Sequence, residues 1–495
     1  MVYLINSKLF LVLFSSILTG LAQHFSVLGF LAWFSLAPFI LVLIQIDTFK
    51  ETIKYSFIWG FVYNIISVYW ISTNIGTVFF IGCISMLLTV LILSFNSIIV
   101  SIIWLKIRKC FSFNSLYLLP FVWISVDYLR TYGSLGFPWI SIANTQTNYF
   151  YLIQNAEIFG IYGIAFWIVL INCLLLSLFY NKIRIHTIII VFLLPFLSGF
   201  ILYSRLNIEV DESIKASLIQ PNVTLFNKSK PSYAKKNLDN LIAKTNSSIL
   251  EGSNLIIWPE SAVPFYNLQD PITLEYISKK VFKTEDVFLL SGDITYVNNR
   301  IYNSSVLFNQ KEISNIYHKQ RLVPMGEYVP FSDIFTSLQN INFGQTNFSI
   351  GIDDVLFDVN GQKFSSLVCF ESTFPEINRR HANLGADFFV YLVNDGWYTS
   401  IPEPRQHAKQ SIFRAIENRK SVLRCANTGI SMVVSPTGKI DIKTQLNTED
   451  VITTFISKTN TITFYTKYGN IFIYLMLIIT VLLLMYSIYK NEDNS

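Results

Sequence analysis

Charged residues are scarce in this chain. Only 14% of its 495 residues are charged, whereas 52% are hydrophobic and 42 are phenylalanine. Because soluble domains carry about 25% charged residues, this composition excludes a protein that is soluble along its whole length. The apolar residues are concentrated between residues 9 and 203 and again between 471 and 486. We therefore expect membrane segments on both sides of a more polar block.

Cysteine and histidine are also rare, with five of each. Neither residue type shows the spacing of a zinc site, and no His-Glu-x-x-His pattern occurs. Cys83, Cys110 and Cys173 lie in or beside apolar segments, where a small buried side chain is the ordinary role. A disulfide between Cys369 and Cys425 in the polar block stays an open alternative. We expect no metal and no cofactor.

Eight apolar runs approach the ~20 residues that a membrane-spanning helix needs. They lie near residues 9–23, 27–46, 55–73, 78–104, 115–132, 159–180, 186–204 and 469–489. Lys and Arg gather in the loops after the second, fourth and sixth runs, and the loops after the first and third carry neither. The positive-inside rule then predicts that both termini are cytoplasmic and that the polar block lies on the opposite side.

The distribution of apolar and charged residues predicts that the chain has three parts. Residues 1–205 form a membrane bundle of about seven spans, residues 206–465 form a folded polar domain, and residues 466–495 form a last span and a tail. In the polar domain, short apolar runs alternate with amphipathic stretches, which favours an α/β layered fold. Helices are expected at 232–250 and 405–419. Strands are expected at 216–220, 255–258, 287–291, 305–308, 364–368, 388–393, 422–426 and 431–435.

Two chemically capable side chains follow strands of the expected sheet. Glu260 comes two residues after the 255–258 run, behind a proline that stops further pairing, and Cys369 follows the 364–368 run directly. Because functional groups in open α/β sheets gather at the carboxyl ends of strands, we expect the two side chains to be neighbours. Ordinary structural roles are the alternatives, with Glu260 beside a helix N-terminus and Cys369 as a buried hydrophobic residue.

Further charged groups lie close to these two in the sequence. Lys319 and Glu327 share a loop in which two prolines and a glycine restrict the backbone, and Glu371 follows the cysteine by two residues. A thiol with a pKa of about 8.5 needs a base or a nearby cation to act as a nucleophile at neutral pH. Glu260 can accept the thiol proton, and Lys319 can stabilise an oxyanion. Glu327 and Glu371 can orient Lys319 or assist a later proton transfer.

Taken together, these segments resemble the Glu-Lys-Cys signature of the nitrilase superfamily. The likeness rests on Trp258-Pro-Glu260, the Lys319 loop with Gly326-Glu327-Tyr328, Cys369-Phe-Glu371, Asn394-Asp-Gly-Trp397, Gln406-His407 and Asn427-Thr-Gly429. With its N-terminal membrane bundle, the chain is similar to the apolipoprotein N-acyltransferases within that superfamily. Gly136-Phe-Pro-Trp139 and Gly160-Ile-Tyr-Gly163 are similar to motifs of their membrane part. The resemblance implies a nitrilase-like αββα sandwich joined to an α-helical membrane bundle of about eight spans.

The resemblance also implies a reaction in two half-steps. Cys369 attacks an acyl ester of a phospholipid, which leaves a thioester and a lysophospholipid, and the α-amine of a diacylglyceryl apolipoprotein then takes the acyl group. Glu260 is the implied base, Lys319 the oxyanion stabiliser, and Glu327 and Glu371 the supporting groups. The implied location is the bacterial inner membrane, with a periplasmic catalytic domain. We expect a monomer with no nucleic-acid partner.

Five residues are candidates for the substrate pocket: Phe370, Asn394, Trp397, Arg130 and Trp139. Phe370 departs from the family, which usually has tyrosine after the nucleophile, and a tryptophan expected near residues 227–229 is absent. The alternative for Asn394 and Trp397 is that they simply form the turn that follows a strand. Arg130 is equally well explained as an interfacial anchor.

Rival functions remain open at this point. The same residues would serve a membrane-anchored nitrilase-type amidase with water as acceptor, although one helix would suffice as its anchor. A Cys-His hydrolase would use His318, His381 or His407 as base. A transporter or receptor is disfavoured because the sequence suggests no charged residues paired along the membrane helices. Residues 332–350, polar with three phenylalanines, are a candidate lid over the site.

Overall fold

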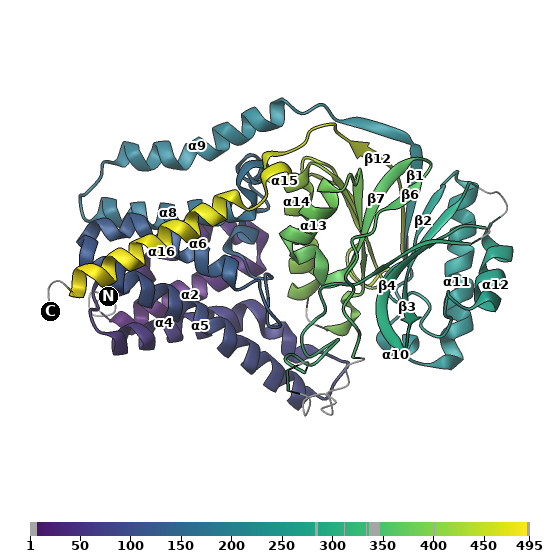
Figure 1. Ribbon diagram of the computed structural model, residues 1–495, viewed down its shortest axis with the longest axis horizontal. Coiled ribbons are helices and arrows are strands. Elements are labelled where there is room, and N and C mark those ends of the chain that lie inside the picture. The colour runs from purple at the N-terminus through teal and green to yellow at the C-terminus, as the bar shows by residue number, and fades with distance from the viewer. Residues whose placement is uncertain are drawn as a thin grey trace. The chain divides into compact units, whose positions relative to one another are not determined.

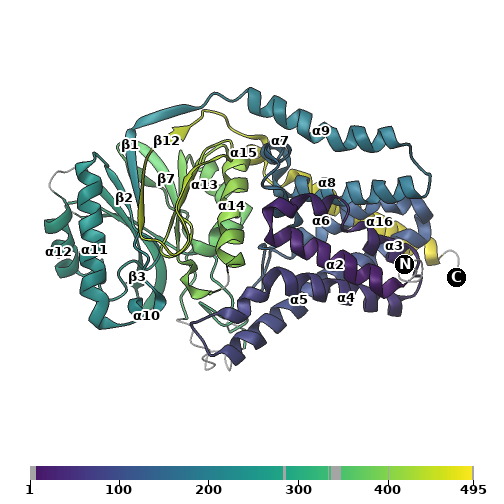
Figure 2. The same ribbon diagram turned by 180° about the vertical axis from the view of Figure 1, so that it is seen from behind.

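The computed structural model describes residues 7–282, 286–310, 312–332, 334–335, 347–399 and 401–492. The chain divides into two compact units (Figures 1 and 2). The helical unit contains the chain up to Thr73, Phe79–Arg205 and the chain from Tyr468 onward, and the α/β unit contains Asn74–Val78 and Leu206–Lys467. Most of the candidate lid at 332–350 lies outside the described residues.

The helical unit is built from apolar helices joined by short 3-10 turns. In chain order these are α2 (Lys8–His24), η1 (Ser26–Trp33), α3 (Ala37–Ile44), α4 (Phe49–Val68), η2 (Tyr69–Thr73), α5 (Phe79–Phe111), η3 (Ser112–Leu118), α6 (Leu119–Leu129), η4 (Ile142–Gln146), α7 (Phe150–Ile153), α8 (Ala156–Phe179), α9 (Ile185–Ser204) and α16 (Ile471–Glu492). Local sequence sets several boundaries. The Thr48 hydroxyl caps α4 by accepting from the Glu51 N–H, and Gly160, at φ 63°, interrupts α8 near its start.

Five helical stretches in the described residues are long and apolar enough to cross a membrane. They are Ser26–Ile44, Phe79–Leu129, Ala156–Phe179, Ile185–Ser204 and Ile471–Lys490. This is fewer than the eight runs predicted. The helix α2 has only 17 residues, α4 has three charged residues among its first six, and α5 and α6 form one continuous stretch. The helices mark an integral membrane protein. The count of eight spans stays a prediction.

The α/β unit contains two six-stranded sheets. The first has the order β12-β1-β2-β3-β4-β5 and the second the order β11-β10-β9-β8-β7-β6. The first-sheet strands are β1 (Glu209–Gln220), β2 (Leu255–Ile257), β3 (Phe288–Val297), β4 (Arg300–Phe308), β5 (Ile313–His318) and β12 (Asp450–Lys458). The second-sheet strands are β6 (Phe357–Val359), β7 (Gln362–Val368), β8 (Phe388–Val393), β9 (Ser421–Ala426), β10 (Met432–Val434) and β11 (Ile440–Lys443). The central strands β1–β3 and β7–β9 run parallel, and the outer pairs are antiparallel.

Helices cover the outer face of each sheet, so the unit has four layers (Figure 1). Apolar side chains of α11 (Pro231–Leu250) and α12 (Pro271–Val281) share a buried core with the first sheet. On the second sheet lie α13 (Pro375–Asn383) and α14 (Pro402–Asn418). The inner faces of the two sheets meet through small polar side chains, where Ser366 Oγ donates to Ser305 Oγ at 2.8 Å. The predicted nitrilase-like α/β domain is confirmed.

Candidate active site

Cys369 lies at a sharp turn where β7 ends and η6 (Cys369–Thr373) begins. Its φ of 52° is in the left-handed region, which destabilises a residue with a β-carbon by about 1–2 kcal/mol. The residue as a whole is partly exposed to solvent. Cys369 and Cys425 are both free cysteines, and the disulfide alternative is therefore wrong.

Glu260 lies in the loop after β2, and its backbone packs closely against the neighbouring strand β3. Its Oε1 accepts a hydrogen bond from Asn303 Nδ2 at 2.8 Å. Its Oε2 is buried and has no hydrogen-bond partner among the residues that the structure describes. The close approach requires a glycine opposite, since a β-carbon on Gly292 would lie 2.6 Å from the Cα of Glu260. Glu260 thus has one oxygen fixed and one available to accept a proton.

Lys319 follows β5 and is almost fully buried between two carboxylates. Its Nζ lies 2.8 Å from Glu327 Oε1 and 3.7 Å from Glu260 Oε1. Burial alone would lower the pKa of Lys319, but the charges of Glu327 and Glu260 outweigh it and hold this pKa above its ordinary value. The lysine therefore carries a fixed positive charge.

Glu327 is held by three donors. Besides Lys319, its Oε1 accepts from Asn303 Nδ2 at 2.9 Å, and its Oε2 accepts from the Val323 N–H at 2.8 Å. Asn303 therefore ties Glu327 to Glu260. The sequence analysis did not identify Asn303 as a site residue, although it is buried and its amide group bridges the two carboxylates.

Glu371 is fully buried and accepts hydrogen bonds mainly from the backbone. Its Oε1 accepts from Tyr317 Oη and the Gln320 N–H, both at 2.7 Å, and from the Arg321 N–H at 3.1 Å. Its Oε2 accepts from the Val368 N–H at 2.8 Å. Glu371 thus joins the backbone next to Lys319 to the end of the strand that carries Cys369.

The surroundings of Cys369 favour the protonated thiol. Burial raises the pKa of this thiol well above its ordinary value, and the negative charge of Glu260 raises it further, while Lys319 lowers it. The thiol is therefore protonated at neutral pH until a base removes the proton. The available Oε2 of Glu260 and the charge of Lys319 are the groups that this chemistry requires.

A second buried lysine lies beside this site. Lys228, at the end of α10 (Leu225–Lys228), donates from Nζ to the backbone carbonyl of Glu260 at 2.9 Å. Burial lowers the pKa of Lys228 to about 8, against the opposing charges of Glu260 and Cys369. Sequence reasoning searched residues 227–229 for a tryptophan and overlooked this lysine. Its position past the carboxyl end of β1, beside β2, is the signal that could have found it.

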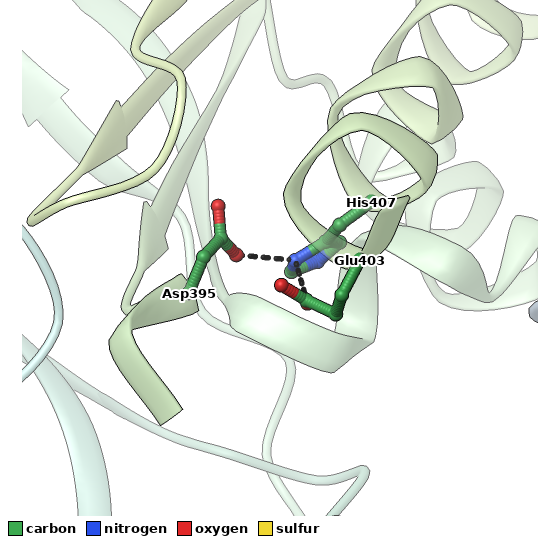
Figure 3. Close-up of side chains that lie close together, drawn as sticks. All are labelled: Asp395, Glu403 and His407. Atoms are coloured by element: carbon green, nitrogen blue, oxygen red, sulfur yellow. Dashed lines mark hydrogen bonds and ion pairs between the residues drawn. The ribbon is translucent and has the colours of Figure 1, made fainter. Parts of the chain in front are cut away.

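Two carboxylates and an imidazole lie close together near the backbone of Cys369, whose carbonyl oxygen is 3.0 Å from His407 Nε2. They belong to Asp395, Glu403 and His407 (Figure 3). Asp395 lies in η7 (Asp395–Trp397), and Glu403 and His407 lie one turn apart on α14. Their candidate ligand atoms all lie within 4.8 Å of one another, a spacing that could hold a metal ion. Arg424 Nη2, however, contacts both oxygens of Asp395, at 3.1 and 2.9 Å. This cation already neutralises the carboxylate, so the donor set fits an ion-pair network better than a metal site.

The pocket candidates of the α/β unit have different surroundings. Phe370 is buried, with its ring edge-on to Phe374 at 5.1 Å. Asn394 is buried, and its Oδ1 accepts from Asn427 Nδ2 at 3.1 Å, which ties together the loops after β8 and β9. Trp397 is 42% exposed. Of the three, only Trp397 presents a large apolar surface to solvent.

The loop Asn74–Val78 packs beside Trp397. The Ile75 N–H donates to the Trp397 carbonyl at 2.9 Å. Gly76 lies against the indole, since a β-carbon at Gly76 would be 2.8 Å from that ring. Ile75 and Val78 are also exposed, so an apolar surface forms around the tryptophan.

Arg130 and Trp139 belong to the helical unit. Arg130 forms an ion pair with Asp127 at 2.9 Å, with both side chains largely buried, and both residues line a cavity together with Tyr63 and Asn64. The expectation that the membrane helices carry no charged pair is therefore wrong, because Asp127 lies one helical turn before Arg130. Trp139 is buried against Trp70. Their role toward Cys369 stays a prediction.

The three histidines of the rival Cys-His reading each have hydrogen-bond partners other than the Cys369 sulfur. His318 Nδ1 lies 2.8 Å from Ser304 Oγ, and His381 Nδ1 lies 2.7 Å from Ser365 Oγ. His407 lies between Asp395 and the backbone carbonyl of Cys369. Glu260, by contrast, keeps one carboxylate oxygen without a hydrogen-bond partner among the described residues.

Comparisons with known proteins show what the chain is similar to. The carbon-nitrogen hydrolase family model matches residues 215–463, half of the chain, and the model of the apolipoprotein N-acyltransferase N-terminal domain matches residues 15–174. The apolipoprotein N-acyltransferase of Chlorobaculum tepidum is 28% identical, with 94% of each chain covered. That of Geobacter metallireducens is 28% identical over 89% of this chain and 88% of its own length. The crystal structure of Saccharomyces cerevisiae Nit3, a nitrilase-superfamily member, matches 50% of this chain and 93% of its own at 19% identity with a TM-score of 0.39. The chain belongs to the carbon-nitrogen hydrolase family and is similar to apolipoprotein N-acyltransferases along most of its length.

Proposed function

We propose that the protein is an apolipoprotein N-acyltransferase that moves an acyl chain from a phospholipid to the N-terminus of a diacylglyceryl apolipoprotein. The observation that carries the proposal is the arrangement of Glu260, Lys319 and Cys369, called the triad below. The Cys369 thiol interacts electrostatically with Glu260, which has a carboxylate oxygen without a partner among the described residues, and with the buried ammonium of Lys319. The likeness of the whole chain to enzymes of this name supports the choice of substrates.

In the first half-reaction, Glu260 removes the proton of Cys369, and the sulfur attacks the carbonyl carbon of a phospholipid ester. Lys319 stabilises the oxyanion of the tetrahedral intermediate. When the carbon–oxygen bond breaks, the protonated Glu260 returns the proton to the leaving lysophospholipid oxygen. The acyl chain remains on Cys369 as a thioester.

In the second half-reaction, the neutral α-amine of the acceptor attacks the thioester carbonyl, and Lys319 again stabilises the oxyanion. Glu260 takes a proton from the attacking nitrogen and passes it to the departing sulfur. The amide leaves, and the free thiol is restored. Because the two substrates use the same triad in turn, the kinetics are ping-pong.

The surroundings of the triad supply the supporting roles. Glu327 holds Lys319 in place, and Glu371 fixes the backbone between Lys319 and Cys369. The exposed apolar surface of Trp397, Ile75 and Val78 suits an acyl chain better than a polar amide substrate. This surface favours the acyltransferase over a nitrilase-type amidase.

The same proposal includes the membrane arrangement. Residues 1–205 and 466–495 form eight spans in the bacterial inner membrane, and residues 206–465 form a periplasmic catalytic domain with both termini cytoplasmic. Lys and Arg in the loops after the second, fourth and sixth runs support this orientation. The protein acts as a monomer, because one chain supplies the whole triad.

The test supplies the purified enzyme in detergent with a phospholipid whose acyl chains carry a heavy isotope and with a synthetic diacylglyceryl-cysteine peptide. The proposal predicts a labelled acyl group in amide linkage at the peptide N-terminus. An amidase or lipase would instead release labelled fatty acid and leave the peptide unchanged. That second result would reject the proposed acceptor.

A further inference from the structure

Residues 348–354, called the strap below, contact the backbone of two residues of the site. The Phe348 N–H donates to the carbonyl of Glu327 at 2.9 Å, and the Gly351 N–H donates to the carbonyl of Lys319 at 2.8 Å. The strap therefore holds both residues of the buried ion pair by their backbone. The proposed mechanism does not use these contacts.

The strap crosses directly over the end of β5. A β-carbon on Gly351 would overlap the carbonyl oxygen of His318, so only glycine fits at this crossing. On the other side, the Lys319 N–H donates to the carbonyl of Asn303 at 2.9 Å. Both backbone polar groups of Lys319 are thus paired, one with β4 and one with the strap.

Apolar burial contributes little to holding the strap in place. Both of its isoleucines, Ile350 and Ile352, are exposed. A segment that buries few apolar side chains opens easily unless polar contacts hold it. The position of the strap therefore depends on its hydrogen bonds and on its last residue, Asp354.

Asp354 anchors the end of the strap to α13. Arg380 donates from Nε to Asp354 Oδ2 at 3.0 Å and from Nη2 to Asp354 Oδ1 at 2.9 Å, and His381 Nε2 lies 3.2 Å from the same Oδ1. Gln320, the neighbour of Lys319, donates from Nε2 to Asp354 Oδ1 at 2.9 Å and accepts from Arg380 Nη2 at 2.6 Å. His381 and Arg380 hold the pKa of Asp354 well below its usual range, although burial opposes them. The anchor therefore keeps its negative charge at neutral pH.

We propose that Asp354 is a positioning residue for the reaction, which anchors the strap and thereby keeps Lys319 and Glu327 in the geometry that oxyanion stabilisation requires. Asp354 acts through the backbone hydrogen bonds of the strap to these two residues. Without the anchor, the strap can move away from β5, and the ammonium of Lys319 loses its fixed position. This role rests on the proposed function, because it concerns acyl transfer at the triad.

The test perturbs the anchor and the strap separately. Asp354→Asn removes the charge of the anchor but keeps the size of the side chain. Gly351→Ala displaces the strap, because the added methyl group overlaps the end of β5. Asp211→Asn is the matched control, since Asp211 also pairs with a partly exposed cation, Lys458, at 2.8 Å.

Two readouts separate positioning from stability. The first is the rate of Cys369 alkylation by iodoacetamide across a pH series, followed on the Cys369 peptide by mass spectrometry. Because Lys319 lowers the pKa of this thiol, we expect the profile of both strap variants to move up by about half a pH unit, which lowers the rate on the rising limb about threefold. The second is acyl-enzyme formation from labelled phospholipid in a single turnover. We expect its limiting rate to fall about tenfold, with the half-saturating lipid concentration unchanged, and Asp211→Asn to match wild type in both readouts.

An alkylation profile of folded Asp354→Asn that coincides with wild type would overturn the proposal, even with a lower thermal midpoint, because Asp354 would then serve stability alone. If Asp354→Asn fails to fold, the profile of Gly351→Ala decides in the same way. Because alkylation needs no lipid, the two proposals can fail separately. A wild-type enzyme that alkylates normally but forms no acyl-enzyme would reject the proposed function, whereas the shift of the alkylation profile would still decide the role of Asp354.

Discussion

Lys319 and Glu327 form a buried ion pair with 2.8 Å between Nζ and Oε1. The distance from the same Nζ to Glu260 is longer, at 3.7 Å. Glu327 therefore neutralises most of the lysine charge at rest and leaves Glu260 free to exchange protons. One carboxylate positions the cation, and the other acts as the base.

Glu327→Gln removes the negative charge that holds Lys319 in place. We expect the rate of acyl-enzyme formation to fall about 100-fold, as when one oxyanion-stabilising group is lost, while the thermal midpoint changes little. Single-turnover measurements with labelled phospholipid check this. Glu376→Gln, which breaks a partly exposed pair with Arg379, is the control and should keep the wild-type rate. A fall of less than threefold in Glu327→Gln would show that Lys319 needs no anchor.

Glu371→Gln tests a structural role. Its carboxylate accepts three backbone N–H groups and the Tyr317 hydroxyl, and an amide NH2 in its place would face donors. We expect the variant to lose about 1–3 kcal/mol for each N–H left without an acceptor. Thermal unfolding in detergent measures the loss. A variant as stable as wild type would contradict this account of the backbone link.

Lys228→Met tests the second ammonium through its pH dependence. Because the pKa of Lys228 falls from 10.5 to about 8 on folding, the folded chain binds fewer protons than the unfolded chain between these values. The stability of wild type relative to Lys228→Met should therefore rise as the pH rises from about 8 to about 10.5 and stay level below about 8. Thermal midpoints of both proteins across this range check the sign. A difference that is flat over the whole range would mean that Lys228 is not desolvated.

Trp397→Ala tests the apolar surface near the site. Because the indole is 42% exposed, its loss should lower acyl-donor affinity, seen as a rise in KM of about tenfold, without lowering the thermal midpoint or the alkylation rate of Cys369. Tyr296→Ala, with 55% of the residue exposed, is the control. If both variants had the same KM as wild type, the acyl chain would have to bind elsewhere.

The predictable part of the fold follows from burial. The strands β7, β8 and β9 are buried along most or all of their length, and the sequence runs at 364–368, 388–393 and 422–426 mark them closely. The strands β5 and β12 were missed because exposed and partly exposed polar residues interrupt their apolar residues. Their strand conformation depends on pairing with β4 and β1, which no local pattern reveals.

Some residues of the candidate site could be predicted from the sequence, and others could not. Glu260, Lys319 and Cys369 were named from short segments with a shared chemistry, and the structure brings them into one site. Asn303 and Lys228 were missed because each is a single polar residue whose partner, Glu260, is remote in the sequence. Only the folded chain shows that their side chains are buried and point at the same carboxylate.

The most direct test of the whole account is the mass of the intact protein after incubation with phospholipid, for wild type and Cys369→Ala. The account predicts an acyl-sized mass gain in wild type that hydroxylamine removes and that the acceptor peptide discharges, and no gain in Cys369→Ala. A gain of the same size in Cys369→Ala, or lipid turnover by that variant at the wild-type rate, would contradict the thioester on Cys369.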